Sequence, residues 1–466
     1  MAPAPPLKIV HVAATATGAP WMIALMREQK RLGHEVAAII PSRDGGIAPQ
    51  LDALGIPCYT AGVDVLFARP RIAQKIVTLL RLARLLRRIR PDVVHSHIVN
   101  SVVTARLASW LADVPMHLGA NAHPISMESA VLRPLEVGTS FCDTATIASC
   151  TYTRDLMLRH GIAEDRLELI YYAVDQSRHD PSLADGARVR AGLGIGAATP
   201  VIGKIAYFYP PARSAGVVPP ALQGRGVKGH EVLIRAVPRV LESFPDAKFI
   251  LVGCGWGPAG PRYERELKEL ASNVAGDAVL FVGERGDVPD LLAAFDVAVQ
   301  CSLSDNLAGT VEALLMARPL AVSDIGGFAD TVLHEETGLK FAVGDSAALA
   351  DAVVRLLRDK ALARRLGENG RRHVLQRFTL ERTVADTETL LSARRRTAAN
   401  HYRVGVSIVR AVVLPIRLLP VSIRVYRGLR RYGFTLRGYF WRRLCRVISR
   451  AVAPMRKPRV TAADPT

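Results

Sequence analysis

The chain contains no run of about 18 uncharged apolar residues, which a membrane-spanning helix needs, so no such helix is expected. Its first residues, MAPAPPLKIVHV, pass directly into a strand pattern and lack the basic start and apolar stretch of a signal peptide. No C-x-x-C pair occurs among the six scattered cysteines, which are Cys58, Cys142, Cys150, Cys254, Cys301 and Cys445. Scattered cysteines of this kind are typical of cytosolic proteins, in which thiols stay reduced, and their spacing predicts no metal site.

Acidic residues are missing from one long stretch of the 466 residues. Residues 394–459 hold 18 of the 61 Lys and Arg residues and no Asp or Glu. Residues 1–393 carry 43 basic and 41 acidic side chains, so almost all of the formal net charge of +19 lies in the C-terminal part. The basic character therefore belongs to a tail, residues 395–466, and not to the body of the chain.

Within this tail, arginines recur every seven residues, a spacing that drifts by only about 20° per step on a helix; they are Arg403, Arg410, Arg417, Arg424 and Arg431. Pro415 and Pro420 exclude one straight helix, and aromatic residues cluster between Tyr432 and Trp441. Basic amphipathic pieces with Trp and Phe are typical of helices that lie in a membrane interface. We therefore expect residues 395–460 to bind an anionic membrane surface. A protein partner is an alternative, and nucleic acid is a less favoured one.

Strand patterns alternate with helix patterns along residues 7–392, which favours doubly wound parallel sheets. A linker rich in Asp, Ser, Pro and Gly at Asp175–Gly192 separates two such halves. Helices are expected at Trp21–Leu32 and Leu380–Leu391. Strands are expected at Lys8–Val12, Glu35–Ile40, Asp92–His95 and Leu167–Ala173, then at Val201–Ile205, Lys248–Val252, Val279–Val282, Val297–Gln300 and Leu320–Ser323. Two sheets in one chain predict a ligand-binding cleft between them.

The most informative segment runs from Cys301 to Gly338. A loop rich in Ser, Asp, Asn and Gly carries Asp305, and a helix expected at Thr310–Ala317 carries Glu312. A buried strand and the Gly326-Gly327 turn follow. A carboxylate near a helix start can accept two sugar hydroxyls at once, and backbone N–H groups in such loops favour anions.

The segment resembles the donor-sugar site of retaining glycosyltransferases of family 4, which have the GT-B fold. In that family a Glu, seven residues and a second Glu occur here; the second holds the ribose of the nucleotide, and the first lies by the transferred sugar. Glu312 matches the second, whereas Ser304 stands eight residues before it. Asp305, one residue closer, is the candidate for the first role.

The resemblance implies two Rossmann-like doubly wound domains that face each other across a cleft, plus a basic C-terminal helical extension. Four parts follow. An acceptor-side domain covers residues 1–177, and a nucleotide-sugar domain covers residues 178–377. A helix within residues 378–394 crosses back to the first domain, and the basic tail covers residues 395–466.

Two lysines match the positions that carry the donor's diphosphate in this family. Lys204 stands for the Arg of a Gly-Arg-Leu pattern, and Lys228 opens the Lys-Gly pair before the next helix. The 23 residues between them exceed the usual few, which predicts an inserted loop at Tyr207–Val227. Gly18 matches one glycine of a Gly-Gly pair near the diphosphate, and Gly255 lies in a loop that contacts the base through its backbone.

Four polar side chains of the first half are further candidates for the site. His97 ends the pattern Asp-Val-Val-His-Ser-His, enters a loop, and matches the family histidine that reaches the donor sugar. The direction of His95 relative to His97 is left open by the pattern. Asn121 and His123 form a second polar cluster that fits an acceptor site.

We therefore expect a retaining glycosyltransferase that moves a sugar from a nucleotide-sugar, most simply a UDP-sugar, to a lipid-linked or polysaccharide acceptor. It would work on the cytoplasmic membrane face, with no cofactor, and with no metal, because no D-x-D pattern suits one. The resemblance implies front-face displacement, in which the leaving phosphate helps to deprotonate the acceptor. Two alternatives are a GT-B nucleotide-sugar epimerase and a non-catalytic membrane-bound module in polysaccharide assembly.

Overall fold

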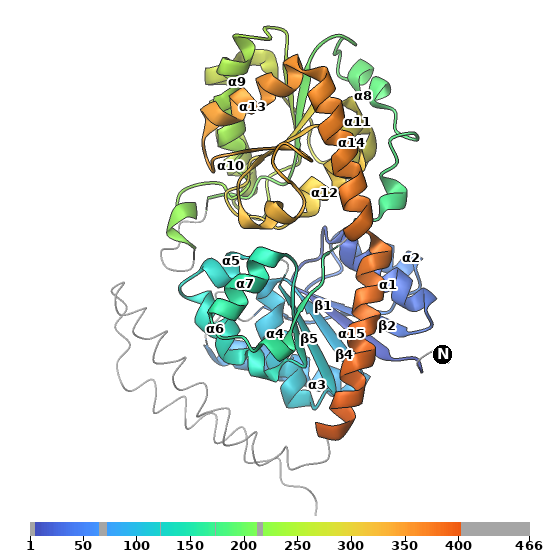
Figure 1. Cartoon of the computed structure of the whole chain (residues 1–466). Coiled ribbons are helices and arrows are strands. Elements are labelled where there is room, and N and C mark those ends of the chain that lie inside the picture. Colours follow the sequence, from blue (N-terminus) through green and yellow to red (C-terminus); the bar gives the residue numbers. More distant parts are fainter. Residues whose placement is uncertain (1–4, 65–71, 122, 173, 212–217, 402–466) are drawn as a thin grey trace, which may run out of the picture.

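Two parallel β-sheets, one in each half of the chain, organise the molecule (Figure 1). The computed structural model describes residues 5–64, 72–121, 123–172, 174–211 and 218–401. Residues 402–466, which form most of the basic tail, lie outside the described residues, and so does the tail's expected contact with a membrane. Within the described part, no helix is both long and apolar enough to cross a bilayer.

The first sheet has the strand order β3-β2-β1-β4-β5-β6-β7, and every neighbouring pair of strands is parallel. Its strands are β1 (Lys8–Ala13), β2 (Glu35–Ile40), β3 (Cys58–Thr60), β4 (Val93–His97), β5 (Met116–Asn121), β6 (Ala145–Ala148) and β7 (Leu167–Leu169). Strands β1 and β4 lie side by side at its centre, where the chain order reverses. In open parallel sheets such a switch point is where ligands bind, beyond the carboxyl ends of the strands.

Helices cover both faces of this sheet. They are α1 (Pro20–Arg31), α2 (Ile47–Ala53), α3 (Ile72–Ile89), α4 (Val99–Ala112), α5 (Ile125–Glu128), α6 (Leu132–Thr139) and α7 (Thr151–Arg159). Leu82 and Leu86 of α3 pack with Val10 and Val94 on one face. The other face, which carries Ile9, Val93 and Leu118, meets a helix from the far end of the chain.

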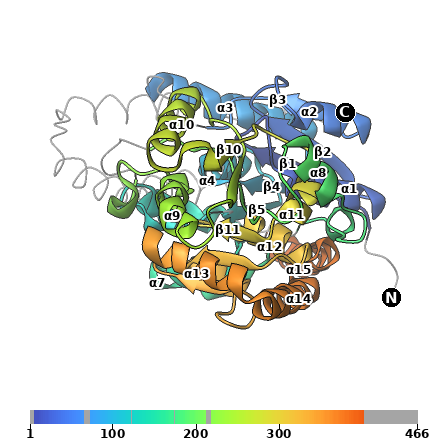
Figure 2. The ribbon, with the colours of Figure 1, turned by 90° about the horizontal axis from the view of Figure 1, so that it is seen from above.

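The second sheet has the strand order β10-β9-β8-β11-β12-β13 and is parallel throughout. Its strands are β8 (Val201–Ile205), β9 (Lys248–Val252), β10 (Val279–Phe281), β11 (Val297–Gln300), β12 (Leu320–Ser323) and β13 (Leu339–Phe341). Its helices are α8 (Gly186–Gly192), α9 (His230–Leu241), α10 (Gly260–Ala275), α11 (Val288–Ala294), α12 (Ala308–Leu315), α13 (Ser346–Arg358) and α14 (Lys360–Arg377). Figure 2 shows α9 and α13 beside each other when this half is seen from above.

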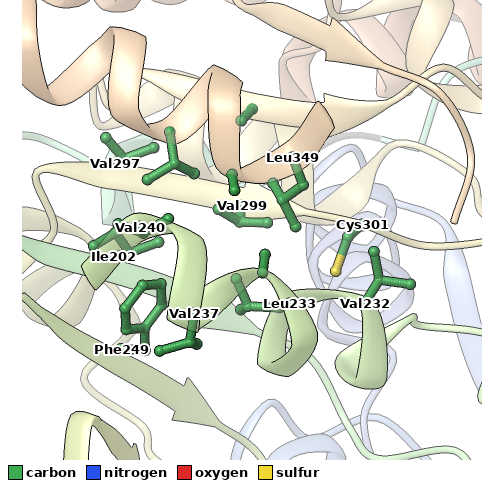
Figure 3. Close-up of a cluster of buried hydrophobic side chains, with 14 of the residues drawn as sticks. Ile202, Val232, Leu233, Val237, Val240, Phe249, Val297, Val299, Cys301 and Leu349 are labelled. Carbon is green, nitrogen blue, oxygen red and sulfur yellow. The ribbon is translucent and has the colours of Figure 1, made fainter. Parts of the chain in front are cut away.

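The core of the second half consists of two apolar layers, one on each face of the sheet. Helices α9 and α13 cover one face, where Val237 and Leu349 pack against Phe249 and Val299 (Figure 3). Helices α11, α12 and α14 cover the other face. Because successive strand residues point to opposite faces, near-continuous apolar strands serve both layers at once.

Helix α15 (Leu380–His401) returns from the second half to the first (Figure 1). Leu380 and Val384 pack on Ala24 and Leu25 of α1. Leu390 and Leu391 join the apolar layer beneath the first sheet. The last helix of the described chain therefore ties its two halves together.

The architecture confirms the expected fold class, and several boundaries differ from the sequence analysis. Strand β4 runs on to His97, so His97 lies in the strand and not in a loop. Strands β5 and β6 were not predicted from the sequence. Strand β7 ends at Leu169, earlier than the expected Ala173. Helix α8 forms the end of the segment that was expected to be a linker. Glu312 is the fifth residue of α12, because that helix begins two residues earlier than its pattern indicates.

A buried ion network supports the carboxyl end of β5. Arg106 of α4 is fully buried, and its Nε and Nη2 donate to the two carboxylate oxygens of Asp143 at 2.8 and 2.6 Å. Nη2 also donates to Oε1 of Glu136 at 2.7 Å, and that oxygen accepts the side-chain amide of Asn121 at 3.0 Å. The network therefore holds Asn121, the last residue of β5, in place.

We expect Arg106→Met to lower the free energy of unfolding of the first half by about 3–5 kcal/mol, because Asp143 and Glu136 would be left buried without their counter-charge. Urea denaturation measures this loss. The matched control is Arg262→Met, since Arg262 is 59% exposed and forms only a helical pair with Glu266. Equal and small effects of the two substitutions would contradict a structural role for the network.

Candidate active site

An ion pair lies where the loop after β11 meets the start of α9. Nζ of Lys228 is 2.7 Å from Oδ2 of Asp305, and both side chains are mostly buried. Ser302 donates its hydroxyl to the same oxygen at 2.7 Å, and the backbone amide of Asn306 donates to Oδ1 at 2.9 Å. Burial acts to raise the pKa of Asp305, but Lys228 and these other partners outweigh it and hold the pKa at about 2. The carboxylate is therefore ionised at neutral pH.

Lys204 adds a second positive charge beside this pair. It lies near the end of β8, is 1% exposed, and donates from Nζ to Oε1 of Gln300 at 3.2 Å. Burial lowers its pKa, and the neighbouring Lys228 lowers it further, while Asp305 acts in the opposite direction. The structure therefore brings Lys204, Lys228 and Asp305 together, as the candidate site requires.

Two glycines allow the backbone to close around the pair. Gly229, which precedes α9, has φ of 65°, and a Cβ there would lie 2.0 Å from the carbonyl oxygen of Cys301. A Cβ on Gly327 would lie 2.3 Å from the carbonyl oxygen of Asp305. Only glycine fits both positions without displacement of the backbone.

Glu312 lies on α12, apart from the ion pair. Its side chain forms no hydrogen bond or ion pair with the described residues, and burial raises its pKa to about 7, against a smaller lowering effect of Arg178. A carboxylate without a partner in such a place is ready to accept hydroxyl groups from a ligand. Its position suits the ribose role that the sequence predicts, which stays a prediction.

The two halves meet through polar contacts next to Asp305. Ser304 donates its hydroxyl to Oε2 of Glu128, from α5 of the first half, at 2.9 Å. The Tyr152 hydroxyl donates to the other oxygen of Glu128 at 3.2 Å. Burial raises the pKa of Glu128, and the hydrogen bonds from Ser304 and Tyr152 oppose that rise. Asp330 of the second half accepts both the backbone amide and the hydroxyl of Thr151.

His97 lies within a cluster of aromatic and imidazole rings. Its Nε2 is 2.9 Å from Nδ1 of His11, and its Nδ1 is 3.3 Å from the hydroxyl of Tyr172. Trp21 packs edge-on against it with ring centroids 5.0 Å apart. His97 is fully buried, so its role toward the donor sugar stays a prediction that requires a rotation of the ring or an opening of this cluster.

The remaining candidates occupy separate positions. Gly18 has φ of 73° in the turn before α1. Gly255 donates its amide to Glu264 at 3.0 Å and packs against the backbone of Gly260. Nε2 of His123 is 4.0 Å from Oδ1 of Asp305, so of the suggested acceptor cluster His123 reaches the ion pair, while Asn121 belongs to the Arg106 network.

Glu128, Tyr152 and His11 were not predicted from the sequence, and in the structure they contact or lie next to candidate residues. No local pattern singles out Glu128, since its partner Ser304 is 176 residues away. Of these three residues, only His11 could have been found from the sequence. It is a polar residue in the second half of the otherwise apolar strand β1, and ligands bind beyond the carboxyl ends of such central strands.

Two family models match the chain. The model described as Glycosyltransferase Family 4 matches residues 21–178, and the one described as Glycosyl transferases group 1 matches residues 221–359. The N-acetyl-alpha-D-glucosaminyl L-malate synthase of Bacillus anthracis is 30% identical over 36% of this chain and 42% of its own length. The chain thus aligns with less than half of this relative.

Two further comparisons extend over most of the chain. The UDP-Gal:alpha-D-GlcNAc-diphosphoundecaprenol alpha-1,3-galactosyltransferase of Escherichia coli is 24% identical over 81% of this chain and 95% of its own length. The crystal structure of Anabaena HepE in complex with UDP and glucose superimposes with a TM-score of 0.70, at 20% identity, over 83% of this chain and 99% of HepE. The latter likeness establishes a shared fold.

The pKa of Glu312 leads to a prediction for stability. The pKa of Glu312 is about 7 in the folded protein and 4.5 ordinarily, so the folded protein binds the carboxyl proton more tightly than the unfolded chain does. The stability that this proton contributes is therefore lost as the pH rises from about 4.5 through 7. Glu312→Gln cannot ionise, so we expect it to unfold at higher temperature than the wild type at pH 8. The gain should be on the order of 2 kcal/mol at pH 8 and near zero at pH 4.5.

The matched control is Glu28→Gln, because a hydrogen bond from Arg31 lowers the pKa of Glu28 and burial opposes this only in part. That substitution should lower the melting temperature at pH 8. Thermal denaturation at both pH values measures the two effects, and a Glu312→Gln protein less stable than the wild type at pH 8 would refute the assignment.

Proposed function

We propose a sugar-transfer reaction for this chain, which belongs to the family 4 glycosyltransferases (glycosyl transferases group 1). The donor would be a nucleotide-sugar, most simply a UDP-sugar, and the acceptor a lipid-linked or polysaccharide sugar. The observation that carries this proposal is the grouping of Lys204 and Lys228 with Asp305 at the carboxyl ends of β8 and β11. The UDP-Gal named for the Escherichia coli relative and the UDP bound to HepE support the choice of donor.

Both lysines would bind the donor's diphosphate, and their charge would serve in place of a metal ion. A charge-assisted hydrogen bond contributes about 1.5–3 kcal/mol, and it strengthens as the leaving group gains negative charge. Lys228 stands directly before the N-terminus of α9, whose free amides also favour anions. To bind phosphate, Lys228 has to share or leave its present partner, Asp305.

Transfer with retention would then proceed on one face of the sugar. The bond between the anomeric carbon and the phosphate oxygen breaks, and the phosphate keeps the electron pair. The acceptor oxygen forms its bond to the same carbon, and its proton passes to the departing phosphate. Catalysis on this route consists of positioning and of stabilising the phosphate's charge.

Glu128 would provide a carboxylate that the second half lacks. Ser304 stands where the family has its first glutamate, and the Ser304 hydroxyl donates to Glu128. Glu128 belongs to the acceptor-side half, so its carboxylate enters the site only when the two halves meet. We infer that Glu128 and Asp305 together flank the transferred sugar.

The test of donor binding is the thermal shift of the purified chain with UDP, GDP and ADP. We expect one nucleotide to raise the melting temperature by several degrees, and we expect Lys228→Ala and Glu312→Ala to abolish that rise. Glu128→Gln is the matched control, since it should keep the nucleotide-dependent rise and lose sugar transfer, measured as UDP release with a lipid-linked acceptor. Transfer should persist with EDTA present.

No rise with any nucleotide would contradict a working donor site and would favour a non-catalytic module. A rise that persists in both Lys228→Ala and Glu312→Ala would place the nucleotide elsewhere. Incorporation of solvent hydrogen into the sugar, without transfer, would favour an epimerase.

We also propose that the protein works at the cytoplasmic face of a membrane, and helix α3 supports this within the described residues. Its exposed Arg81, Arg84 and Arg88 line a surface hollow of about 520 Å³ beside Thr60 and Thr78. Leu82 and Leu86, on the opposite side of the helix, are buried in the core. Each basic residue near an anionic surface contributes about 1 kcal/mol of binding.

We expect the full chain to sediment with vesicles that contain phosphatidylglycerol, and less with purely zwitterionic vesicles or at high salt. Replacement of Arg81, Arg84 and Arg88 by Glu should weaken binding by about tenfold or more. The matched control replaces the exposed Arg262, Arg265 and Arg364 of the second half by Glu, with the same change in charge. Equal binding of both triple variants would exclude α3 as a membrane contact.

A further inference from the structure

Three histidines gather on one face of the first sheet. Strands β1 and β4 pair so that His11 lies opposite His95 and Ala13 lies opposite His97. Side chains two residues apart on a strand share a face, so all three imidazoles project to the same side. Their ring centroids are 4.1–5.2 Å apart, and one nitrogen of each ring lies within 4.8 Å of the others.

The outer nitrogens of two of these rings are already held. Nε2 of His11 is 2.8 Å from Oε1 of Gln29, and Nδ1 of His97 is 3.3 Å from the Tyr172 hydroxyl. The inner nitrogens, Nδ1 of His11 and Nε2 of His97, face each other at 2.9 Å. This is the arrangement of metal-binding histidines, in which a second partner at the far nitrogen fixes the orientation and tautomer of the ring.

His95 is the unsatisfied member of the cluster. It is 2% exposed, and neither of its ring nitrogens has a hydrogen-bond partner among the described residues. Buried polar groups normally find a partner in protein or water, so an orphan of this kind needs an explanation. An ion bound between the three rings would supply one.

We propose that His11, His95 and His97 bind one divalent transition-metal ion of the zinc class. Imidazole suits Zn²⁺, Co²⁺ and Ni²⁺, whereas Mg²⁺ and Ca²⁺ need oxygen ligands that the three rings do not offer. Zn–N bonds of about 2.0–2.1 Å in tetrahedral geometry place ligand nitrogens about 3.3 Å apart, so the 2.9 Å pair has to open only slightly. A water molecule would fill the fourth position.

The ion would clamp β1 to β4 at the switch point of the sheet. Because it takes Nε2 of His97, the occupied site also holds that ring away from any donor sugar. The ion itself would make or break no bond of the sugar, and its binding can be measured whether or not the chain transfers sugars.

The test uses the untagged full chain, freed of metal and dialysed to equilibrium against Zn²⁺ or Co²⁺, because an ion reaches these buried rings only through a local opening. We expect one ion per chain by elemental analysis, and visible absorption of tetrahedral Co²⁺. We also expect the melting temperature to rise by about 5 °C at saturating Zn²⁺. Mg²⁺ should produce none of these effects.

His95→Phe is the decisive variant, because it removes the ligand nitrogens, breaks no hydrogen bond, and keeps a ring of similar shape in the core. It should lose the Co²⁺ absorption and the Zn²⁺-dependent rise while it melts cooperatively without metal. If it fails to fold, His11→Gln is the second variant, with the same expected loss. The control His160→Ala removes an exposed imidazole and should bind as the wild type does. No bound ion, or binding that survives both ligand substitutions, would overturn the proposal.

Discussion

The ion pair of Lys228 and Asp305 is the constraint around which the rest of the candidate site is built. A mostly buried ammonium group needs a counter-charge, and Asp305 provides it at 2.7 Å, with its own charge stabilised by Ser302 and Asn306. Gly229 and Gly327 lie against the backbone of Cys301 and Asp305, where any side chain would prevent the close approach that this pair needs. In the proposed reaction, a nucleotide diphosphate would offer Lys228 the same kind of partner, so the lysine would exchange one negatively charged partner for another.

The domains communicate through residues that flank this pair. Ser304 and Asp305 are neighbours in sequence, yet Ser304 reaches Glu128 of the first half while Asp305 holds Lys228 of the second. Asp330 makes a second link to Thr151, and α15 packs on both sides of the joint. A movement that separates the halves would therefore break the hydrogen bonds from Ser304 to Glu128 and from Thr151 to Asp330.

Much of the fold could be read from local pattern, and the exceptions have physical causes. Val201–Ile205 and Val297–Gln300 were predicted with the right bounds, since more than half of their residues are apolar, as buried parallel strands require. Strand β5, MHLGAN, carries a histidine, a glycine and an asparagine, and its stability comes from the buried Arg106 network instead of local propensity. The extension of β4 to His97 depends on pairing with Ala13 and Ala120, which no local pattern records.

The candidate site was predictable where it lies within one segment, and not where it is shared. Resemblance to the family's motifs singled out Lys228, Asp305 and Glu312, which all belong to loops or helices of the second sheet. Glu128 and His11 acquire meaning only through partners 176 and 86 residues away. His97 belongs to both groups. The family resemblance predicts that it contacts the donor sugar, whereas its ring in the structure contacts His11 and Tyr172, which are distant in sequence. The proposed metal ion would bind Nε2 of His97, whereas the role that the family resemblance implies needs the same ring to turn toward the donor sugar, so the two roles would exclude each other.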